Sequence, residues 1–290
     1  MKKNSIVSIM VERKKEKLKA LKKPFNPKPL PKPKSIKTLE RGYFSEIKKI
    51  YEVAKSLVDS ILIKKLVYIQ NLRDSSRPSL DSMTSFKHDS WVDEITKTME
   101  SIKVQYQQVI TIPKIKTIAE SQAKKINRAN HVAFEKGLEK VLAIPPIRIE
   151  AWLGEEIKAF TKANVDLITS IPSQYFEQVE QTVSRMVQQG KTTKDITAAI
   201  KRRYDVNESR AALIARDQTN KFNGSLTQLR NTEVGITQYQ WSTSGDDRVR
   251  PDHAEREGEV FSWDDPPEDG HPGEAINCRC TALGIIGDVE

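Results

Sequence analysis

The chain has 290 residues, of which 37% are hydrophobic and 30% charged, and its formal net charge is +9. The charge is concentrated in residues 1–37, which hold 13 Lys or Arg and 2 Asp or Glu, leaving 35 basic and 37 acidic residues elsewhere. No run reaches the roughly 18 consecutive apolar residues that a membrane helix needs, because Lys64 and Lys65 interrupt the best candidate, residues 61–69. Two cysteines exclude a disulfide framework. We expect no membrane span, no signal peptide and synthesis in the cytoplasm.

Residues 1–37 are predicted to form a basic, flexible arm. Proline alternates with lysine over residues 22–37, a pattern that disfavours helix and favours extended polyproline II structure. Clustered lysines bind phosphates without sequence preference, so the arm is either a nucleic-acid contact or a solvated tail. The candidate nucleic-acid-binding residues are Lys14, Lys15, Lys17, Lys19, Lys22, Lys23, Lys28, Lys32 and Lys34.

Residues 38–146 are predicted to form long amphipathic helices. Apolar residues at steps of three and four begin at Ile36 and continue to about Leu72, which indicates one long helix. A Ser-rich loop is expected over residues 74–90, followed by helices over 91–110 and 114–142 on either side of a break at Pro113.

Residues 147–233 are predicted to form a compact region of shorter helices. The first is expected to end before Pro172, and the next to run from Ser173 to a stop at Gly190. Thr192 and Asp195 have the spacing of a capping box that opens a third helix. Asn207 is expected to cap a fourth, which ends near residue 231.

Residues 234–290 differ from the preceding chain in composition and apolar pattern, and are predicted to form a small module that contains β-strands. Tyr239 and Trp241 alternate with glutamines, and later apolar residues are separated by segments rich in Asp, Pro and Gly, as in short strands joined by turns. The predicted fold is therefore mainly α, with a small β-containing C-terminal module.

The last 38 residues hold four potential metal ligands, His253, His271, Cys278 and Cys280. Thiolate and imidazole ligands suit a tetrahedral zinc ion, which would tie together loops that have few aliphatic residues. Asp247 could replace either histidine as an oxygen ligand. The alternative is that both cysteines are reduced thiols that pack as small hydrophobic side chains.

The run from Ser244 to His253, SGDDRVRPDH, has two interpretations. Its acidic and imidazole groups could support metal-assisted hydrolysis of nucleic acid. Asp and Arg in a turn bounded by glycine also form ion pairs and Asx turns, and no nucleophile with an adjacent base is apparent. We favour the structural interpretation and expect no enzymatic activity.

Several motifs occur together in an order that resembles the phage head morphogenesis family, which includes the phage Mu F protein and minor head proteins of tailed phages. They are IARDQTNKFNG from Ile214, GITQYQW from Gly235, DDRVRPDH from Asp246, and INCRC from Ile276. The family's motif residues fall on Arg216, Tyr239, Trp241, Asp246, Asp247, Arg248, Arg250, Asn277 and Arg279. The resemblance covers residues 152–286.

The chain departs from the family pattern at two places. Asp217 and Gln218 stand where the family commonly has Thr-Glu. His271 lies several residues before the position that a histidine often occupies next to the Asn-Cys-Arg-Cys motif, which leaves His253, Cys278 and Cys280 as the firmer ligand set.

The resemblance implies a minor capsid protein at the portal vertex, inside the head of the virion. Its expected partners are the portal protein, a scaffold or major capsid protein, and packaged DNA through the basic arm. Two alternatives stay open: a stand-alone nucleic-acid-binding protein, and a metal-dependent hydrolase or nuclease.

Overall fold

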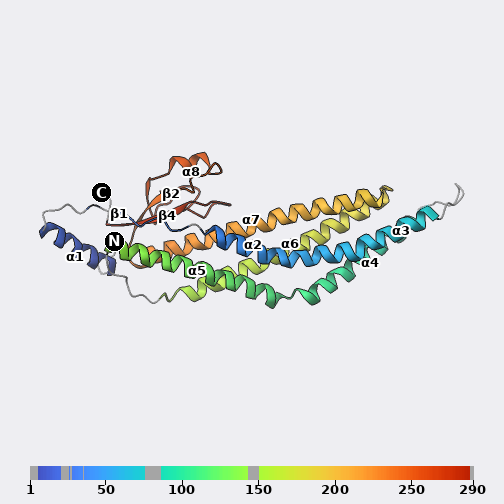
Figure 1. Ribbon diagram of the computed structural model, residues 1–290, viewed down its shortest axis with the longest axis horizontal. Coiled ribbons are helices and arrows are strands. Elements are labelled where there is room, and N and C mark those ends of the chain that lie inside the picture. The colour runs from blue at the N-terminus through green and yellow to red at the C-terminus, as the bar shows by residue number, and fades with distance from the viewer. Residues whose placement is uncertain are drawn as a thin grey trace. The chain divides into compact units, whose positions relative to one another are not determined.

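The computed structural model describes residues 6–20, 26, 28–34, 36–75, 86–142 and 150–287. The predicted fold, mainly α with a small β module, is confirmed, and Figure 1 shows β2, β4 and α8 of the C-terminal part of the chain with β1, from its N-terminal part, beside them. The elements in order are α1 (Ile6–Ala20), β1 (Lys28–Pro29), α2 (Lys37–Leu57), the π-helical turn η1 (Val58–Ile63), α3 (Lys64–Ser75), α4 (Phe86–Val109), α5 (Ile112–Leu142), α6 (Leu153–Gln188), α7 (Thr193–Glu233), β2 (Gln238–Ser242), α8 (Pro251–Glu255), β3 (Val260–Ser262) and β4 (Thr281–Ile286).

The chain forms two compact units, each assembled from separate stretches of sequence. Unit 1 contains residues 1–41, 120–160 and 215–290, and unit 2 contains residues 42–119 and 161–214. This division differs from the sequential one predicted, because helices that are distant in the chain pack together.

Unit 2 is a helical bundle whose core is built from amphipathic stripes. The predicted long helix after Ile36 is formed by α2, η1 and α3, and the next two predicted helices correspond to α4 and α5. Aromatic rings fill the interior: the centroids of Tyr51 and Tyr204 lie 5.1 Å apart, and those of Tyr106 and Phe176 5.3 Å apart. Such tilted and edge-on pairs add to the stabilisation that burial provides.

Unit 1 contains a four-stranded antiparallel sheet in the order β1-β4-β2-β3. One apolar cluster joins α1, β1, α5, the end of α7 and β4 through Val11, Leu30, Phe134, Leu138, Leu142, Val234, Ile236 and Ile286. A second cluster lies on the sheet around Tyr239 and Trp241. The C-terminal module is therefore anchored to α1 and α5, which lie much earlier in the chain.

The prediction that a helix ends before Pro172 is wrong, because α6 continues through this residue to Gln188. A proline inside a helix removes one backbone hydrogen bond and costs about 3 kcal/mol. The apolar stripe continues past it, however, with Ile168, Ile171, Tyr175 and Val179 all at most 1% exposed. Burial of this stripe outweighs the local cost.

The prediction that Asn207 caps a separate helix is also wrong, because α7 is continuous from Thr193 to Glu233. Asn207 is 2% exposed and its amide donates to the carbonyl of Arg203, 2.8 Å away. The side chain therefore bonds back onto its own helix. Thr192 caps the start of α7 as predicted: the backbone N–H of Asp195 donates to Thr192 Oγ1 over 3.2 Å, and this hydroxyl donates to Oδ2 of Asp195 over 2.8 Å.

The N-terminal arm is more ordered than the sequence suggests. Residues 6–20 form α1, and Val11 on this helix is 1% exposed. β1 pairs with β4, and Leu30 is buried beside Phe134. Lys22 and Lys23 lie outside the described residues. The predicted extended conformation applies to the short stretch around β1, whereas α1 forms because its apolar face packs on unit 1.

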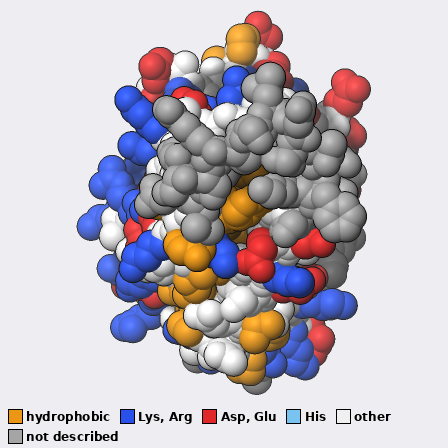
Figure 2. Space-filling model, turned by 90° about the vertical axis from the view of Figure 1, so that its right-hand side faces the viewer, with side chains coloured by type: hydrophobic (Ala, Val, Ile, Leu, Met, Phe, Trp, Pro, Cys, Tyr) orange, Lys and Arg blue, Asp and Glu red, His pale blue; other side chains and the backbone are white. Residues whose placement is uncertain are grey.

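Within the part of the chain that the structure describes, no helix is both long enough and apolar enough to cross a membrane. On the face presented in Figure 2, Lys and Arg side chains gather along one edge, and hydrophobic side chains lie beside them. This face thus carries both charged and apolar side chains.

Candidate metal centre

The sheet of unit 1 forms the wall of the candidate centre. Strand β2 buries alternate side chains, so Tyr239 and Trp241 are 0% and 1% exposed while Gln238 and Gln240 point the other way. Trp241 pairs in register with Ala282 of β4. The two cysteines lie immediately before this strand and are buried in the same cluster.

His253 approaches the cysteines from the short helix α8. Pro251 begins this helix, a position that proline favours because its missing N–H would have no helical partner there. His253 is 2% exposed, and its ring packs edge-on against Trp241 with 5.1 Å between the centroids. The imidazole is therefore held in one orientation by packing.

Nδ1 of His253 lies 3.6 Å from Sγ of Cys278 and 3.4 Å from Sγ of Cys280. The three ligand atoms all lie within 4.8 Å of one another, and all three residues are buried. Zinc bonds of about 2.3 Å to sulfur and 2.0–2.1 Å to nitrogen, at tetrahedral angles, separate these atoms by about 3.6 Å. The spacing thus fits a metal between the ring and the two sulfurs.

The opposite side of the ring contacts a carboxylate. Asp269 Oδ2 lies 2.6 Å from Nε2 of His253, and Arg256 contacts the other oxygen at 2.5 Å. A carboxylate at Nε2 favours the tautomer in which Nδ1 carries the lone pair and faces the sulfurs. Metal-binding histidines usually have such an orienting partner.

The two thiols differ in acidity. The hydrogen bond from the Cys280 thiol lowers the pKa of Cys278, outweighing the opposite effect of burial. The same shared proton, together with burial, raises the pKa of Cys280. The first proton therefore leaves from Cys278, which gives this sulfur the thiolate form that binds metals.

A hollow of about 80 Å³ opens beside these ligands. Its described lining includes His253, both cysteines, Ser244 and Asn277, and no Asp or Glu. The space is large enough for a water molecule. The described residues thus offer three protein ligands and room for a small fourth ligand.

Two of the predicted ligands lie elsewhere. His271 is held by Tyr239, whose hydroxyl is 3.0 Å from Nδ1, and by Gln228, whose amide nitrogen is 3.2 Å from Nε2. Burial lowers the pKa of His271, which favours the neutral ring. Asp247 is exposed and belongs neither to this set nor to the other group of potential metal ligands among the described residues, Asp252, His253 and Asp269. The structure therefore does not bring together the predicted set of two histidines and two cysteines.

The remaining motif residues fix the loops around the centre. Arg279, between the cysteines, contacts both oxygens of Asp246 at 2.5 Å, and its hydrogen bonds lower the pKa of Asp246. Arg250 donates to the carbonyl of Ile276 over 2.9 Å. Arg248 lies 3.9 Å from Asp246 and is largely exposed. These contacts support the structural interpretation of the SGDDRVRPDH segment.

Helix α7 also holds the loop before Cys278. Arg216 donates to Oδ1 of Asn277 over 2.8 Å, and Asp217 Oδ1 accepts the backbone N–H of Asn277 over 2.8 Å. Asn277 has φ 63°, in the left-handed region that asparagine tolerates better than most residues. Asp217, the departure from the family pattern, thus has a definite structural role.

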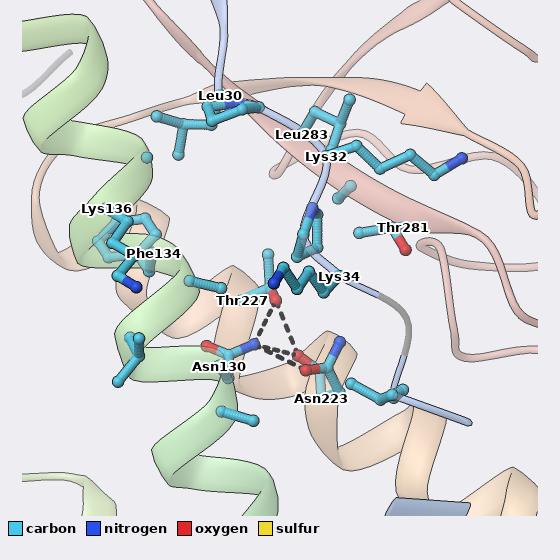
Figure 3. Close-up of a pocket in the computed structure, with 18 of the residues that line it drawn as sticks. Leu30, Lys32, Lys34, Asn130, Phe134, Lys136, Asn223, Thr227, Thr281 and Leu283 are labelled. Carbon is cyan, nitrogen blue, oxygen red and sulfur yellow. Dashed lines mark hydrogen bonds between the residues drawn. The ribbon is translucent and has the colours of Figure 1, made fainter. Parts of the chain in front are cut away.

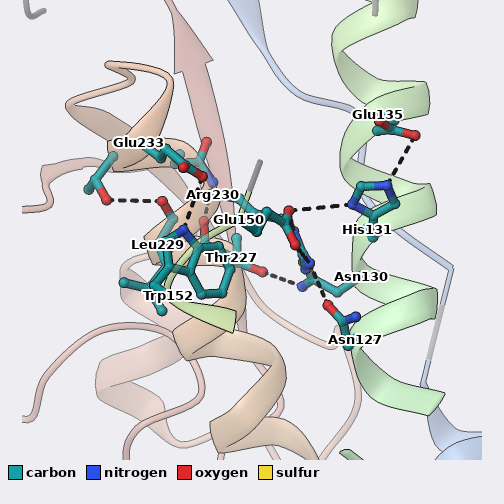
Figure 4. Close-up of polar contacts among 12 residues, drawn as sticks. Asn127, Asn130, His131, Glu135, Glu150, Trp152, Thr227, Leu229, Arg230 and Glu233 are labelled. Atoms are coloured by element: carbon teal, nitrogen blue, oxygen red, sulfur yellow. Dashed lines mark hydrogen bonds and ion pairs between the residues drawn. The ribbon is translucent and has the colours of Figure 1, made fainter. Parts of the chain in front are cut away.

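Sequence reasoning missed a buried arginine in unit 1 (Figure 4). Arg230 is 0% exposed and contacts both oxygens of Glu150, at 2.7 and 2.8 Å. Its other donors reach Asn127 and Asn130 at 2.5 Å each, and the guanidinium stacks over Trp152. Neither this arginine nor Asp269 has a local sequence signal, because their partners lie far away in the chain or in an irregular loop.

Comparisons with known proteins agree with the motif order. Residues 177–283 match a family model described as Phage Mu protein F like protein. An uncharacterized protein of Haemophilus influenzae is 35% identical over 198 residues, which cover 67% of this chain and 44% of that relative. The match thus spans less than half of the relative's length. No solved structure matches the chain at a significant level.

Proposed function

We propose that this chain, which belongs to the phage Mu protein F-like family, is a minor head protein that acts in procapsid assembly at the portal vertex. The observation that carries the proposal is the extent of the family match. Residues 177–283 include the whole of α7, β2, α8 and β3, and the candidate centre with both cysteines. The motifs quoted from the sequence thus lie in one folded part of unit 1 and on the helix that supports it.

The proposed partners are the portal protein and, during assembly, a scaffold or major capsid protein, with the chain inside the virion head. Long helices with mixed surfaces suit docking onto another helical protein. The test is co-purification of the full chain with the portal from infected cells, and its detection in purified heads. Portal rings that carry none of the chain, from cells that make both proteins, would contradict the proposal.

Contact with packaged DNA is the second part of the proposal. Lys17 and Lys19 are exposed at the end of α1, and Lys28, Lys32 and Lys34 are exposed around β1. Lys14, Lys15 and Lys32 already have partners, which are the carbonyl of Val141, Glu12 and the carbonyl of Thr243 in turn. Deletion of residues 1–37 would remove Val11 and Leu30 from the core, so charge reversal is the better test.

The variant Lys17→Glu/Lys19→Glu is expected to weaken DNA binding and reduce its salt dependence by about two phosphate contacts. Lys114→Glu/Lys116→Glu, with the same change in net charge, is the control. If DNA binding by wild type and by the Lys17/Lys19 variant has the same salt dependence, these two lysines do not contact DNA. If the variant also assembles heads as wild type does, the solvated-tail interpretation is favoured.

We propose further that a structural zinc ion is held by His253, Cys278 and Cys280. The support is the ligand spacing, the burial of all three residues and the carboxylate behind His253. Zinc would supply a crosslink among α8, the loop before β4 and the sheet, where aliphatic packing is sparse.

The zinc proposal is tested by elemental analysis and thermal melts of the full chain. Wild type and His271→Gln are expected to retain near-stoichiometric zinc, whereas His253→Gln and Cys278→Ser/Cys280→Ser lose it and melt earlier. Retention of zinc by the double cysteine variant, or its absence from wild type purified with zinc present, would contradict the proposal.

The observations favour a structural role for this centre over hydrolysis. The described lining of the hollow contains no carboxylate that could act as a general base beside the ligands. Metal-dependent cleavage of DNA or RNA that disappears in His253→Ala would overturn this view.

A further inference from the structure

A basic groove lies in unit 1, apart from the candidate metal centre (Figure 3). Its volume is about 990 Å³, and it lies among the stretch after β1, helix α5, helix α7 and strand β4. Among its described lining residues, six are basic and none is Asp or Glu; the basic ones are Lys32, Lys34, Lys125, Arg128, Lys136 and Lys140.

The basic side chains are mostly free to meet a partner. Lys32 donates to the carbonyl of Thr243, 2.5 Å away. The other five are exposed, and no ion pair is recorded for them among the described residues. Lys34 extends over the groove toward Thr227. Like charges gathered at one rim, without carboxylates to balance them, favour an acidic ligand.

Beside a polar patch in which the Asn130 amide donates to Asn223 and Thr227, the groove has an apolar part (Figure 3). Leu30 and Phe134 are buried in it, and the described lining also contains Pro31, Pro33 and Leu283. Val132 is 41% exposed at its side. The small residues Ala129, Ala133 and Gly137 of α5 also line the groove. Apolar partner side chains would therefore be buried between the charges.

One edge of β4 also faces the groove. β1 pairs with β4 only at Lys28–Ile286 and Pro29–Ile285, and the last ladder bond runs from the N–H of Leu30 to the carbonyl of Gly284. Pro31 and Pro33 fall at positions of this register whose N–H would point away from β4. Residues 31–34 line the groove together with residues 281–284, so a partner segment would lie against this stretch and α5.

From the basic rim and the apolar part of the lining we infer that the groove binds an extended, acidic segment of a partner protein, with carboxylates on the basic rim and apolar side chains against the apolar part. The aliphatic part of the lining favours a peptide over single-stranded nucleic acid, which stacks its bases on exposed aromatic rings. Phe134, the aromatic residue in the described lining, is 6% exposed. The inference deepens the proposed function by giving the chemistry of one docking segment, but its test needs only the purified chain.

The test is fluorescence anisotropy with three labelled probes: a short peptide in which Glu alternates with Val, the same peptide with Lys in place of Glu, and a single-stranded DNA oligonucleotide. Wild type is expected to bind the Glu-Val peptide and not the Lys-Val peptide. Lys125→Glu/Lys136→Glu should weaken this binding about tenfold or more, because attraction becomes repulsion at the rim. Lys114→Glu/Lys116→Glu, on the same helix but outside the groove, should leave it unchanged.

A second variant separates peptide from nucleic acid. Val132→Ser removes apolar contact without changing charge, so it should weaken the Glu-Val peptide by a few-fold and leave any DNA binding as it was. DNA that displaces the peptide and responds to Lys125→Glu/Lys136→Glu but not to Val132→Ser would assign the groove to nucleic acid and overturn the inference. Absence of peptide binding by folded wild type would also overturn it, while leaving portal association to its own test.

Discussion

Nε2 of His253 lies 2.6 Å from Oδ2 of Asp269, on the side of the ring opposite the two cysteine sulfurs. Asp269 is itself held by Arg256, whose guanidinium stacks over Trp241 at 5.1 Å. The orientation of the imidazole therefore depends on a chain of contacts that leads back to the buried face of β2. A ligand fixed in this way loses little freedom when a metal binds.

Asp269→Asn is expected to lower zinc affinity by about 10- to 100-fold, because the amide orients the imidazole less well and leaves it less basic. Competition with a chromophoric chelator measures the change. Glu268→Gln, the adjacent exposed residue, is the control and should bind as wild type does. Equal zinc affinities for Asp269→Asn and wild type would show that Asp269 does not orient His253 for zinc binding.

Glu150 and Arg230 give unit 1 a dependence on acid. Burial alone would raise the pKa of Glu150, but its hydrogen bonds and charge interaction with Arg230 outweigh this effect and lower it. The ion pair therefore contributes fully to stability above the unfolded carboxyl pKa of about 4.3. The contribution disappears as the pH falls through the lower pKa of the folded state.

Glu150→Gln should reduce the free energy of unfolding by about 3–5 kcal/mol at neutral pH, because it leaves a fully buried guanidinium without its counter-charge. It should also remove this carboxylate's part of the loss of stability at acidic pH. Urea unfolding at several pH values measures both effects, with Glu139→Gln, an exposed residue of α5, as the control. A parallel pH profile for Glu150→Gln and wild type would contradict the prediction.

The helices and the small sheet were predictable because their signals are local. The stripe after Ile36, the capping box at Thr192 and the alternation around Trp241 each follow from spacing within a few residues. The two wrong helix boundaries, at Pro172 and Asn207, arose where tertiary burial overrode a local breaker or cap signal.

The candidate site was predicted in part. His253, Cys278 and Cys280 do come together, whereas His271 packs against Tyr239. Residue type and proximity in sequence could not separate the two histidines, since both pack on the same face of β2, His253 against Trp241 beside the cysteines and His271 against Tyr239. The roles of Asp269 and Arg230 depend on contacts between distant segments, which local patterns in a single sequence do not predict.

Gly284 is expected to be indispensable for the packing of β4 on α7. A methyl group at this position would overlap the amide of Asn231, which is 0% exposed and bound to the carbonyl of Thr227 at 2.6 Å. Gly284→Ala should therefore destabilise the protein by about 1–3 kcal/mol. Gly42→Ala, in a helix with open space around it, should stabilise by about 1 kcal/mol. Equal unfolding free energies for the two variants would contradict the prediction, because they would show that β4 shifts to make room for the methyl group at little cost.

The loop before Cys278 should depend on its backbone more than on its exposed side chain. Asn277→Gly and Asn277→Val both remove the hydrogen bond to Arg216, but only glycine accepts φ 63° without strain. The valine variant should therefore be less stable than the glycine variant by roughly 1–2 kcal/mol, and should bind zinc more weakly because Cys278 is displaced. Urea unfolding and chelator competition measure the two effects. Similar losses in both variants would instead assign the role to the Arg216 contact, since that is what the two substitutions share.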